Sequence, residues 1–338
     1  MTDAARGDGG ARAPEARAAA AEALRVVVLG AGGVGGYFGG VLARAGHQVT
    51  LLARGDHLAA IHARGLELRM PGAGAPPMVT HPEATDDAGA LPEADLVVVA
   101  VKSYSLGEVA PAAARLAAAG ATVLPLLNGV EAADRLADGG VPRAALLGGV
   151  TVISAARVAP GVIERRSAFQ RVVVGRFGEH AAPSERVSRI VQAFLDAGVD
   201  AQASSRIEVE LWHKLAFLAS MAAACGLARR AVGAVRDASL GRLLIERAVA
   251  EIVAVGRAHG VAMDPDIGAD TVAAIDALPA EMRPSFLADL ERGGPTELDV
   301  LSGAVSRFGR RYSVPTPVHD TAVAALGATL GLGSTGVV

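Results

Sequence analysis

Two lysines and one asparagine are the residues whose types point most directly to chemistry. Lysine occurs only at positions 102 and 214 among 32 basic residues, and asparagine occurs only at position 128. A lysine ammonium is a compact, titratable charge, whereas the arginine guanidinium does not lose its proton in proteins. A chain that otherwise uses arginine for its cations therefore nominates Lys102, Lys214 and Asn128 as functional residues.

A glycine turn near the start of the chain would position such residues against a nucleotide. A β-branched run over 25–29 enters the turn, a helical pattern follows to 45, and a second strand pattern covers 48–53. In the G-x-G-x-x-G spacing the first glycine permits a tight turn, the second lets the backbone approach a pyrophosphate, and the third lets the helix pack on the strand. The predicted site consists of Gly30, Ala31, Gly32, Gly33, Val34 and Gly35.

Arg54 follows the second strand, at the position that distinguishes the two nicotinamide cofactors. A carboxylate there binds the ribose 2′-hydroxyl of NAD, whereas an arginine accommodates the 2′-phosphate of NADP. We therefore predict NADP as the cofactor. The alternative is that Arg54 is a solvated loop residue and that Asp56 contacts the ribose.

Two further strand patterns end at the rare polar residues. A continuous β-branched run over 95–101 is typical of a central parallel strand and leads into Lys102, while a run over 121–127 leads into Asn128. Ligands of open α/β sheets bind beyond the carboxyl ends of the strands, so we expect both side chains on the same edge as the glycine turn. Because Asn-Gly is also a common turn dipeptide, Asn128 has a purely local alternative role.

The remaining patterns predict an α/β Rossmann-type domain followed by an all-helical domain. We place a disordered arm at 1–23, the NADP-binding domain at 24–204, the helical substrate domain at 205–331 and a disordered tail at 332–338. Strand patterns cover 149–156, 162–165 and 170–174, and a helix covers 187–197. A capping box at Ser205-x-x-Glu208 opens the helical domain. Its helices are expected over 206–231, 238–259, 264–278, 285–291, 297–311 and 318–330.

Together these motifs resemble the ketopantoate reductase (2-dehydropantoate 2-reductase) family over about residues 24–330. The resemblance is carried by the glycine turn, by Arg54, and by the segments 100–102, 127–129, 210–214 and 295–299. It implies a Rossmann domain followed by a helical domain of the 6-phosphogluconate dehydrogenase C-terminal type. It also implies NADPH-dependent reduction of 2-dehydropantoate to pantoate, a step of pantothenate and coenzyme A biosynthesis.

The resemblance also implies roles for individual residues. Lys214 would bind the substrate and act as the general acid at its carbonyl. Asn128 would be a second catalytic residue, and both Asn128 and Lys102 would lie near the nicotinamide end of the cofactor. Ser285 and Glu297 would bind substrate, with Glu297 also beside the cofactor. Relatives active on ketopantoate carry asparagine four and eight residues after the lysine, where this chain has Leu218 and Ala222. Both positions share a helix face with the lysine, so we expect Leu218 and Ala222 to line the substrate site.

Elementary chemistry supports the role implied for Lys214. Hydride reduction of a 2-oxo acid places negative charge on the carbonyl oxygen, so a proton donor or cation is needed within hydrogen-bond reach. Lys214 lies in an otherwise apolar run over 211–228, and its alternative role is that of a surface lysine. His213 is the alternative donor, but adjacent helical residues point about 100° apart, so only one of the two faces the site.

Ser285 and Glu297 have plain structural alternatives as well. Thr296-x-x-Asp299 is a helix-start pattern, and the helix dipole would stabilise a glutamate in that first turn without any substrate. Pro284-Ser285 can be a simple turn and helix cap.

Composition excludes several other classes of protein. The formal net charge is −3 with no long block of one sign, which argues against a nucleic-acid partner. A single cysteine, Cys225, excludes an internal disulfide and a cysteine metal cluster, which favours a cytoplasmic protein without a metal. The charge-free run over 26–43 begins as a strand and is rich in glycine, so we expect no membrane span.

Three functions remain after these exclusions. The first is an NADPH-dependent reductase of a 2-oxo acid, with ketopantoate as the leading substrate. The second is a related dehydrogenase acting on another 2-oxo or 3-oxo acid, which the changes at Leu218 and Ala222 would permit. The third is a non-catalytic NADP-binding sensor. A homodimer is compatible with the sequence but is not specified by it.

Overall fold

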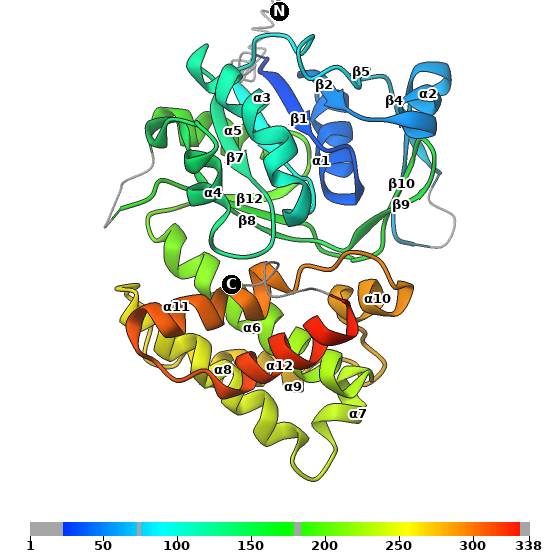
Figure 1. Cartoon of the computed structure of the whole chain (residues 1–338). Coiled ribbons are helices and arrows are strands. Elements are labelled where there is room, and N and C mark those ends of the chain that lie inside the picture. The colour runs from blue at the N-terminus through cyan, green and yellow to red at the C-terminus, as the bar shows by residue number, and fades with distance from the viewer. Residues whose placement is uncertain (1–22, 73–75, 179–183, 332–338) are drawn as a thin grey trace, which may run out of the picture.

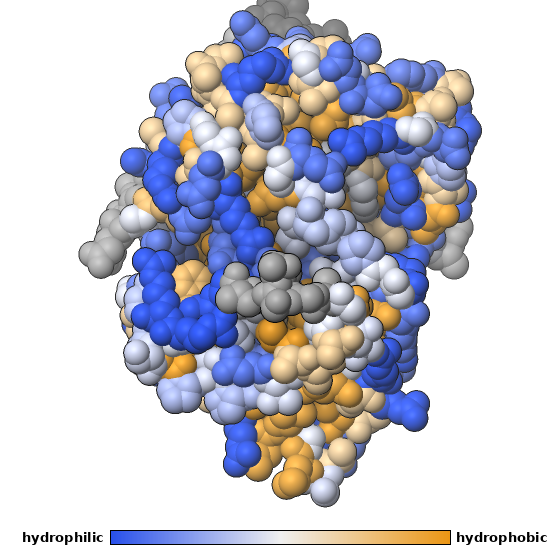
Figure 2. Space-filling view, in the orientation of Figure 1, coloured by the Kyte–Doolittle hydropathy of each residue, from blue (hydrophilic) through white to orange (hydrophobic). Residues whose placement is uncertain are grey.

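The structure is a computed structural model in which residues 23–72, 76–178 and 184–331 are described. Three sheets with their helices form the upper part of Figure 1, and helices α6 to α12 form the lower part. In the same orientation, Figure 2 shows hydrophilic and hydrophobic residues mixed over the upper part and hydrophobic residues gathered at the lower tip. The arm predicted at 1–23 falls almost wholly outside the described residues, and the tail at 332–338 lies outside them. The α/β class with a following helical domain is confirmed.

The first sheet has five parallel strands in the order β5-β2-β1-β6-β7. The strands are β1 (Arg25–Leu29), β2 (Gln48–Leu52), β5 (Glu83–Thr85), β6 (Leu96–Val99) and β7 (Thr122–Pro125). The associated helices are α1 (Gly33–Arg44), α2 (Gly55–Arg64), α3 (Leu106–Ala118) and α4 (Ala132–Asp138). The strand order reverses on either side of β1, which is where such sheets bind dinucleotides.

Two smaller sheets complete the first domain. One has the order β4-β3-β10-β9 and the other the order β12-β11-β8. Their strands are β3 (Leu66–Arg69), β4 (Met78–Thr80), β8 (Gly148–Val152), β9 (Ala155–Ala159), β10 (Val162–Arg165), β11 (Arg171–Gly175) and β12 (Asp200–Ser204). Helix α5 (Glu185–Asp196) follows a cap in which Ser184 Oγ accepts a hydrogen bond from the Val187 N–H.

The single strand predicted over 149–156 is wrong, because the chain leaves one sheet and enters another at Ser154. Strand β8 ends at Val152 and β9 begins at Ala155. At the break, the Ser154 N–H donates to Ser167 Oγ at 3.0 Å, and the Ser154 carbonyl accepts from the Arg166 N–H at 2.7 Å. These local hydrogen bonds replace a continued strand ladder.

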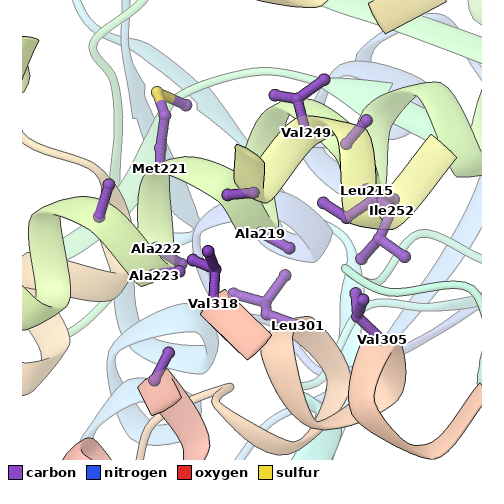
Figure 3. Packing of buried hydrophobic residues seen from close by; sticks show 14 of the residues in the cluster. Leu215, Ala219, Met221, Ala222, Ala223, Val249, Ile252, Leu301, Val305 and Val318 are labelled. Atoms are coloured by element: carbon purple, nitrogen blue, oxygen red, sulfur yellow. The ribbon is translucent and has the colours of Figure 1, made fainter. Parts of the chain in front are cut away.

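The helical domain is built around one long central helix, α6. Its elements are α6 (Ile207–Ala228), α7 (Val232–Arg236), α8 (Gly241–Ala258), α9 (Ile267–Asp276), α10 (Ser285–Arg292), the π-helix η3 (Asp299–Gly303), α11 (Ala304–Tyr312) and α12 (Pro317–Thr329). Small side chains on α6 such as Ala219 and Ala223 let neighbouring helices approach closely, and Figure 3 shows them among the side chains of this core. Leu215 of α6, Ile252 of α8 and Val305 of α11 belong to the same core.

The capping box predicted at Ser205 is wrong, and the helix-start pattern considered as the structural alternative for Glu297 is not formed either. Helix α6 is preceded by Arg206 without a side-chain cap, and Ser204 Oγ instead accepts from the Arg206 N–H at 3.0 Å. Near the second pattern, helical structure begins as a π-helix at Asp299, and Thr296 Oγ1 is buried with no partner among the described residues. Ile207, the first residue of α6, packs with Val150 and Val173 of the first domain, so this helix begins at an interdomain packing contact instead of a side-chain cap.

Helix α6 is long and apolar enough to cross a membrane by length and composition. The qualifying window has a mean hydropathy of 1.3, and 61% of it is buried inside the protein. Its apolarity is therefore explained by its central place in the helical domain. The charge-free run over 26–43 divides between β1 and α1.

Candidate functional site

The glycine turn has the backbone geometry that a dinucleotide requires. Gly30 adopts φ +105°, and a Cβ there would lie 2.9 Å from the Val101 nitrogen. A Cβ at Gly35 would lie 2.1 Å from the Gly30 carbonyl oxygen, so glycine is needed for the close packing of α1 on β1. A Cβ at Gly32 would meet no described atom within 4 Å. The turn is thus tight on its inner side and open at Gly32.

The first turn of α1 suits an anion. It contains no acidic residue, and no side chain among the described residues caps its N–H groups. Free N–H groups at a helix N-terminus attract phosphate by hydrogen bonding and through the helix dipole. Gly33 contributes packing, because a Cβ there would lie 2.2 Å from the carbonyl oxygen of Ala155 in β9. These residues fit the pyrophosphate of a dinucleotide.

A buried histidine that the sequence analysis missed holds this turn in place. His57 Nε2 lies 2.8 Å from the Ala31 carbonyl oxygen, and His57 Nδ1 accepts a hydrogen bond from the Gly161 N–H at 2.8 Å. The two contacts require a neutral ring protonated at Nε2. Burial lowers the pKa of His57, which favours that neutral form. No local sequence signal reveals this role, because Gly161 lies 104 residues away.

Arg54 lies at the start of α2, just beyond the carboxyl end of β2. Its side chain is exposed, and Nη1 forms an ion pair with Glu108 Oε2 of α3 at 3.0 Å. Asp56, the alternative ribose ligand, is also exposed in the first turn of α2. Arg54 therefore lies at the expected edge of the sheet, but it is paired with a carboxylate that the sequence analysis did not consider.

A cluster of polar residues, in which two carboxylates are buried and Lys102 is partly exposed, joins the two domains beyond the same edge; we call it the carboxylate cluster. Lys102 Nζ contacts Asp289 Oδ2 and Glu297 Oε2, both at 3.1 Å, and Asn128 Nδ2 donates to Glu297 Oε2 at 3.0 Å. Glu297 is 5% exposed and Asp289 is 9% exposed. Burial alone would lower the pKa of Lys102, but the two carboxylates together raise it above its usual value.

The structure thus brings together Lys102, Asn128 and Glu297, which the sequence analysis had named separately. It adds Asp289, which that analysis missed. The sequence does hold a clue to Asp289. It lies four residues after Ser285, so the two residues share one face of the predicted helix, and Ser285 had already been named as a site residue. Ser285 itself is exposed as the first residue of α10 and has no hydrogen bond to a described side chain.

Lys214 approaches this cluster from α6. Burial lowers the pKa of its ammonium to about 8, and the nearby negative charge of Glu297 partly opposes that shift. Among the described residues the ammonium has no hydrogen-bond or ion-pair partner. His213 is exposed on a different face of the helix. A charged group that is mostly buried and lacks a partner is available to an anionic ligand.

The two positions that differ from asparagine-bearing relatives lie in different environments. Leu218, one turn after Lys214, is partly buried at the margin of the helical core. Ala222, two turns after Lys214, is 2% exposed and packs inside that core. Figure 3 labels Ala222 among the core side chains. Only Leu218 has surface left for a ligand.

A second set of charged residues, the interdomain clamp, lies next to the carboxylate cluster in sequence. It consists of Glu131 and Arg135 from the first domain and Asp299 and Arg307 from the second. Arg135 contacts Asp299 Oδ2 at 2.7 Å, and Arg307 contacts Glu131 Oε2 at 2.6 Å. Arg135 also contacts Glu131, and Arg307 also contacts Asp299, so each member has two partners of opposite charge.

Comparison with known proteins places this fold and site in one family. The family model for ketopantoate reductase PanE/ApbA matches residues 26–179, and the model for the C-terminal domain of the same family matches residues 206–329. The chain belongs to the ketopantoate reductase family. It is therefore an oxidoreductase of that family, with a Rossmann-like first domain.

Two curated relatives cover nearly the whole chain. The 2-dehydropantoate 2-reductase of Halobacterium salinarum is 34% identical over 299 residues, which is 88% of this chain and 96% of the relative. The uncharacterized oxidoreductase YkpB of Bacillus subtilis is 31% identical over 304 residues, which is 90% of this chain and 98% of the relative.

Solved structures agree with this assignment of the fold. A PanE/ApbA family ketopantoate reductase from Ralstonia eutropha superposes with a TM-score of 0.81 at 29% identity, covering 90% of this chain and 98% of that one. D-mandelate dehydrogenase, solved with NADH and anilino(oxo)acetate, gives a TM-score of 0.79 at 21% identity, covering 91% of this chain and 100% of that one. The second likeness concerns the fold alone.

Proposed function

We propose that this ketopantoate reductase family member uses NADPH to reduce a 2-oxo acid to a 2-hydroxy acid, with 2-dehydropantoate as the leading substrate. One observation carries the proposal: the ammonium of Lys214, which has no hydrogen-bond or ion-pair partner among the described residues, lies within electrostatic range of the buried Glu297. Glu297 in turn binds Lys102 and Asn128 at the sheet edge that bears the glycine turn. The similarity to a 2-dehydropantoate 2-reductase over most of both chains supports the choice of substrate.

The open turn at Gly32 and the uncapped start of α1 would hold the pyrophosphate of the cofactor. Arg54 would contact a 2′-phosphate at the end of β2. When bound, the cofactor supplies the hydride. The protein side chains then have to bind the oxo acid, orient it and provide the proton.

Lys214 has the properties that the proton donor needs. With a pKa of about 8 its ammonium is mostly charged at neutral pH, yet it gives up its proton more readily than an ordinary lysine. The negative charge of Glu297 raises the pKa of Lys214 against the effect of burial and so favours the protonated ammonium. The same positive charge attracts the substrate carboxylate and stabilises the oxygen that becomes negative during reduction.

Glu297 also links the donor to the first domain. Its carboxylate accepts from Lys102 and from Asn128, so these two residues hold it at the boundary between the domains. Asp289 holds the same lysine from α10. Buried polar groups with several partners are held rigidly, which is how a site keeps its donor aligned with a substrate.

Leu218 favours a second candidate, a reductase for a 2-oxo acid with an aliphatic branch. A hydroxyl group facing Leu218 would find no partner on that side chain, at a cost of about 1–3 kcal/mol. A purely aliphatic branch carries no such cost. The reaction and its proton donor are the same in both candidates.

A cytoplasmic setting belongs to the same proposal. The single thiol, Cys225, is buried in α6, and burial raises its pKa to about 11. Such a thiol is unsuited to act as a nucleophile, and one cysteine offers no structural disulfide.

The test is a panel of 2-oxo acids, including 2-dehydropantoate and aliphatic analogues, followed by NADPH absorbance. We expect NADPH oxidation with at least one member and slower reaction with NADH. Protein that binds NADPH but reduces no member would support a non-catalytic NADP-binding sensor. Faster reaction with NADH would contradict the proposed cofactor.

A further inference from the structure

The ion pair between Arg54 and Glu108 lies where the two nicotinamide cofactors differ. Arg54 Nη1 and Glu108 Oε2 are 3.0 Å apart, and their side chains are 66% and 53% exposed. Arg54 precedes the first turn of α2, and Glu108 lies in the first turn of α3. Both helices follow the glycine turn in the chain, and they begin after β2 and β6, the strands on either side of β1.

Hydrogen bonds to the glycine turn hold the segment that bears Arg54. The Ala31 N–H donates to the Leu52 carbonyl at 3.2 Å, and His57 Nε2 lies 2.8 Å from the Ala31 carbonyl oxygen. Leu52 and His57 bracket Arg54 in the sequence. The start of the Arg54 side chain is therefore held beside the turn that would bind the pyrophosphate, and the adenosine ribose would lie between them.

A carboxylate at this point acts differently on the two cofactors. The 2′-phosphate of NADPH would have to share Arg54 with Glu108, and two negative groups on one guanidinium repel each other. The adenosine ribose of NADH carries a 2′-hydroxyl in place of the phosphate, and this hydroxyl can donate a hydrogen bond to a carboxylate. The carboxylate of Glu108 therefore disfavours binding of NADPH and is compatible with binding of NADH.

We propose that Glu108 is a specificity-determining residue of the nucleotide site, which weakens the preference for NADPH that Arg54 creates. This inference rests on the proposed NADPH-dependent function. Both side chains are exposed, so water and salt screen the repulsion. We expect Glu108 to alter the relative affinity by about three- to tenfold.

The test measures binding without turnover, by calorimetric titration with 2′-phospho-ADP-ribose and with ADP-ribose. These probes differ only in the 2′-phosphate and lack the nicotinamide. Glu108→Gln should raise the affinity ratio in favour of the phosphorylated probe by about three- to tenfold. Glu108→Ala should act in the same direction, and Glu108→Asp, which keeps the charge, should stay closer to the wild type. The effect of Glu108→Gln should shrink as salt is raised.

Glu93→Gln is the matched control, because it neutralises a carboxylate that is paired with Arg25 at the opposite end of the sheet. It should leave the ratio unchanged, whereas Arg54→Ala should lower it. An unchanged ratio in Glu108→Gln, with both probes bound by the wild type, would overturn the role of Glu108 alone. Failure of the wild type to bind either probe would overturn the proposed function and this inference together.

Discussion

The carboxylate cluster and the interdomain clamp join the same two domains but differ in how completely their members are paired. In the clamp, each of two arginines contacts each of two carboxylates, and the charges cancel. Beside the carboxylate cluster, Lys214 is mostly buried and has no direct partner among the described residues. Charged side chains are therefore fully paired with one another in the clamp, whereas beside the carboxylate cluster one ammonium is left without a direct partner among the described residues.

The difference indicates which group acts on a ligand. Any movement of the domains that separates a fully paired set of charges leaves some of these charges without partners, which is unfavourable. Such a set therefore holds the domains in one position. A buried cation without a partner retains a desolvation cost that an anionic ligand can relieve. We therefore propose that the clamp positions the domains and that the region around Lys214 binds the substrate and reacts with it. Substitutions in the two sets should separate activity from stability.

The largest effect is expected at Lys214. Lys214→Ala should lower kcat by about 10²–10⁴, the usual contribution of a positioned acid, while NADPH affinity and the unfolding midpoint change little. Steady-state kinetics, titration and thermal unfolding measure the three quantities. His213→Ala, at the exposed neighbouring position, is the control and should keep most of the activity. Normal turnover in folded Lys214→Ala would assign the proton to His213 or to water.

The pH dependence should reveal the same ammonium. The acid must be protonated to act, and the pKa of Lys214 is lowered to about 8, so kcat/KM should fall above about pH 8 by about tenfold per pH unit. Below about pH 8 the ammonium is charged, so kcat/KM should no longer depend on the titration of Lys214. Lys214→Arg, if active, should not show the fall in kcat/KM above about pH 8, because a guanidinium does not titrate in this pH range. A flat profile up to pH 10 in the wild type would remove Lys214 from the role of acid.

A substitution in the interdomain clamp should reduce the stability of the protein more than its activity. Arg307, with a side chain 21% exposed, lies between the surface and buried classes of ion pair. Arg307→Gln should therefore lower the free energy of unfolding by about 1–3 kcal/mol. Urea unfolding measures this change. Arg143→Gln, which breaks an exposed pair with Asp134, is the control and should cost at most about 1 kcal/mol. If Arg307→Gln lost activity as severely as Lys214→Ala, the proposed division of roles would fail.

The smallest effect concerns the margin of the site at Leu218. Leu218→Asn should shift kcat/KM towards 2-dehydropantoate relative to an aliphatic 2-oxo acid by about tenfold, because the amide can pair with the substrate hydroxyl. Ala222→Asn is unsuitable as a second change, since Ala222 is packed in the core and an amide there would be buried. A wild-type preference of about a hundredfold for 2-dehydropantoate over its deoxy analogue would show that other residues bind the hydroxyl.

The glycine turn illustrates what the sequence by itself determines. The left-handed φ of Gly30 and the contact between Gly35 and the Gly30 carbonyl depend on residues a few positions apart, so the spacing of glycines reveals them. The same holds for the strands that lead into Lys102 and Asn128, because each is a short and mostly apolar run. Parallel strands share one carboxyl edge, and this rule alone brings these residues near one another.

Tertiary structure alone decided which side chains meet across the domain boundary. Lys102 meets Asp289 across 187 residues and Glu297 across 195, and no local pattern encodes such pairs. Glu297 reads locally as a first-turn glutamate of a capped helix, yet its carboxylate binds Lys102 and Asn128. The sequence analysis also placed Ala222 beside the substrate, whereas packing of α6 buries it. Local propensities are worth about 1 kcal/mol each, and burial of whole helix faces outweighs them, so these contacts depend on how the two domains pack.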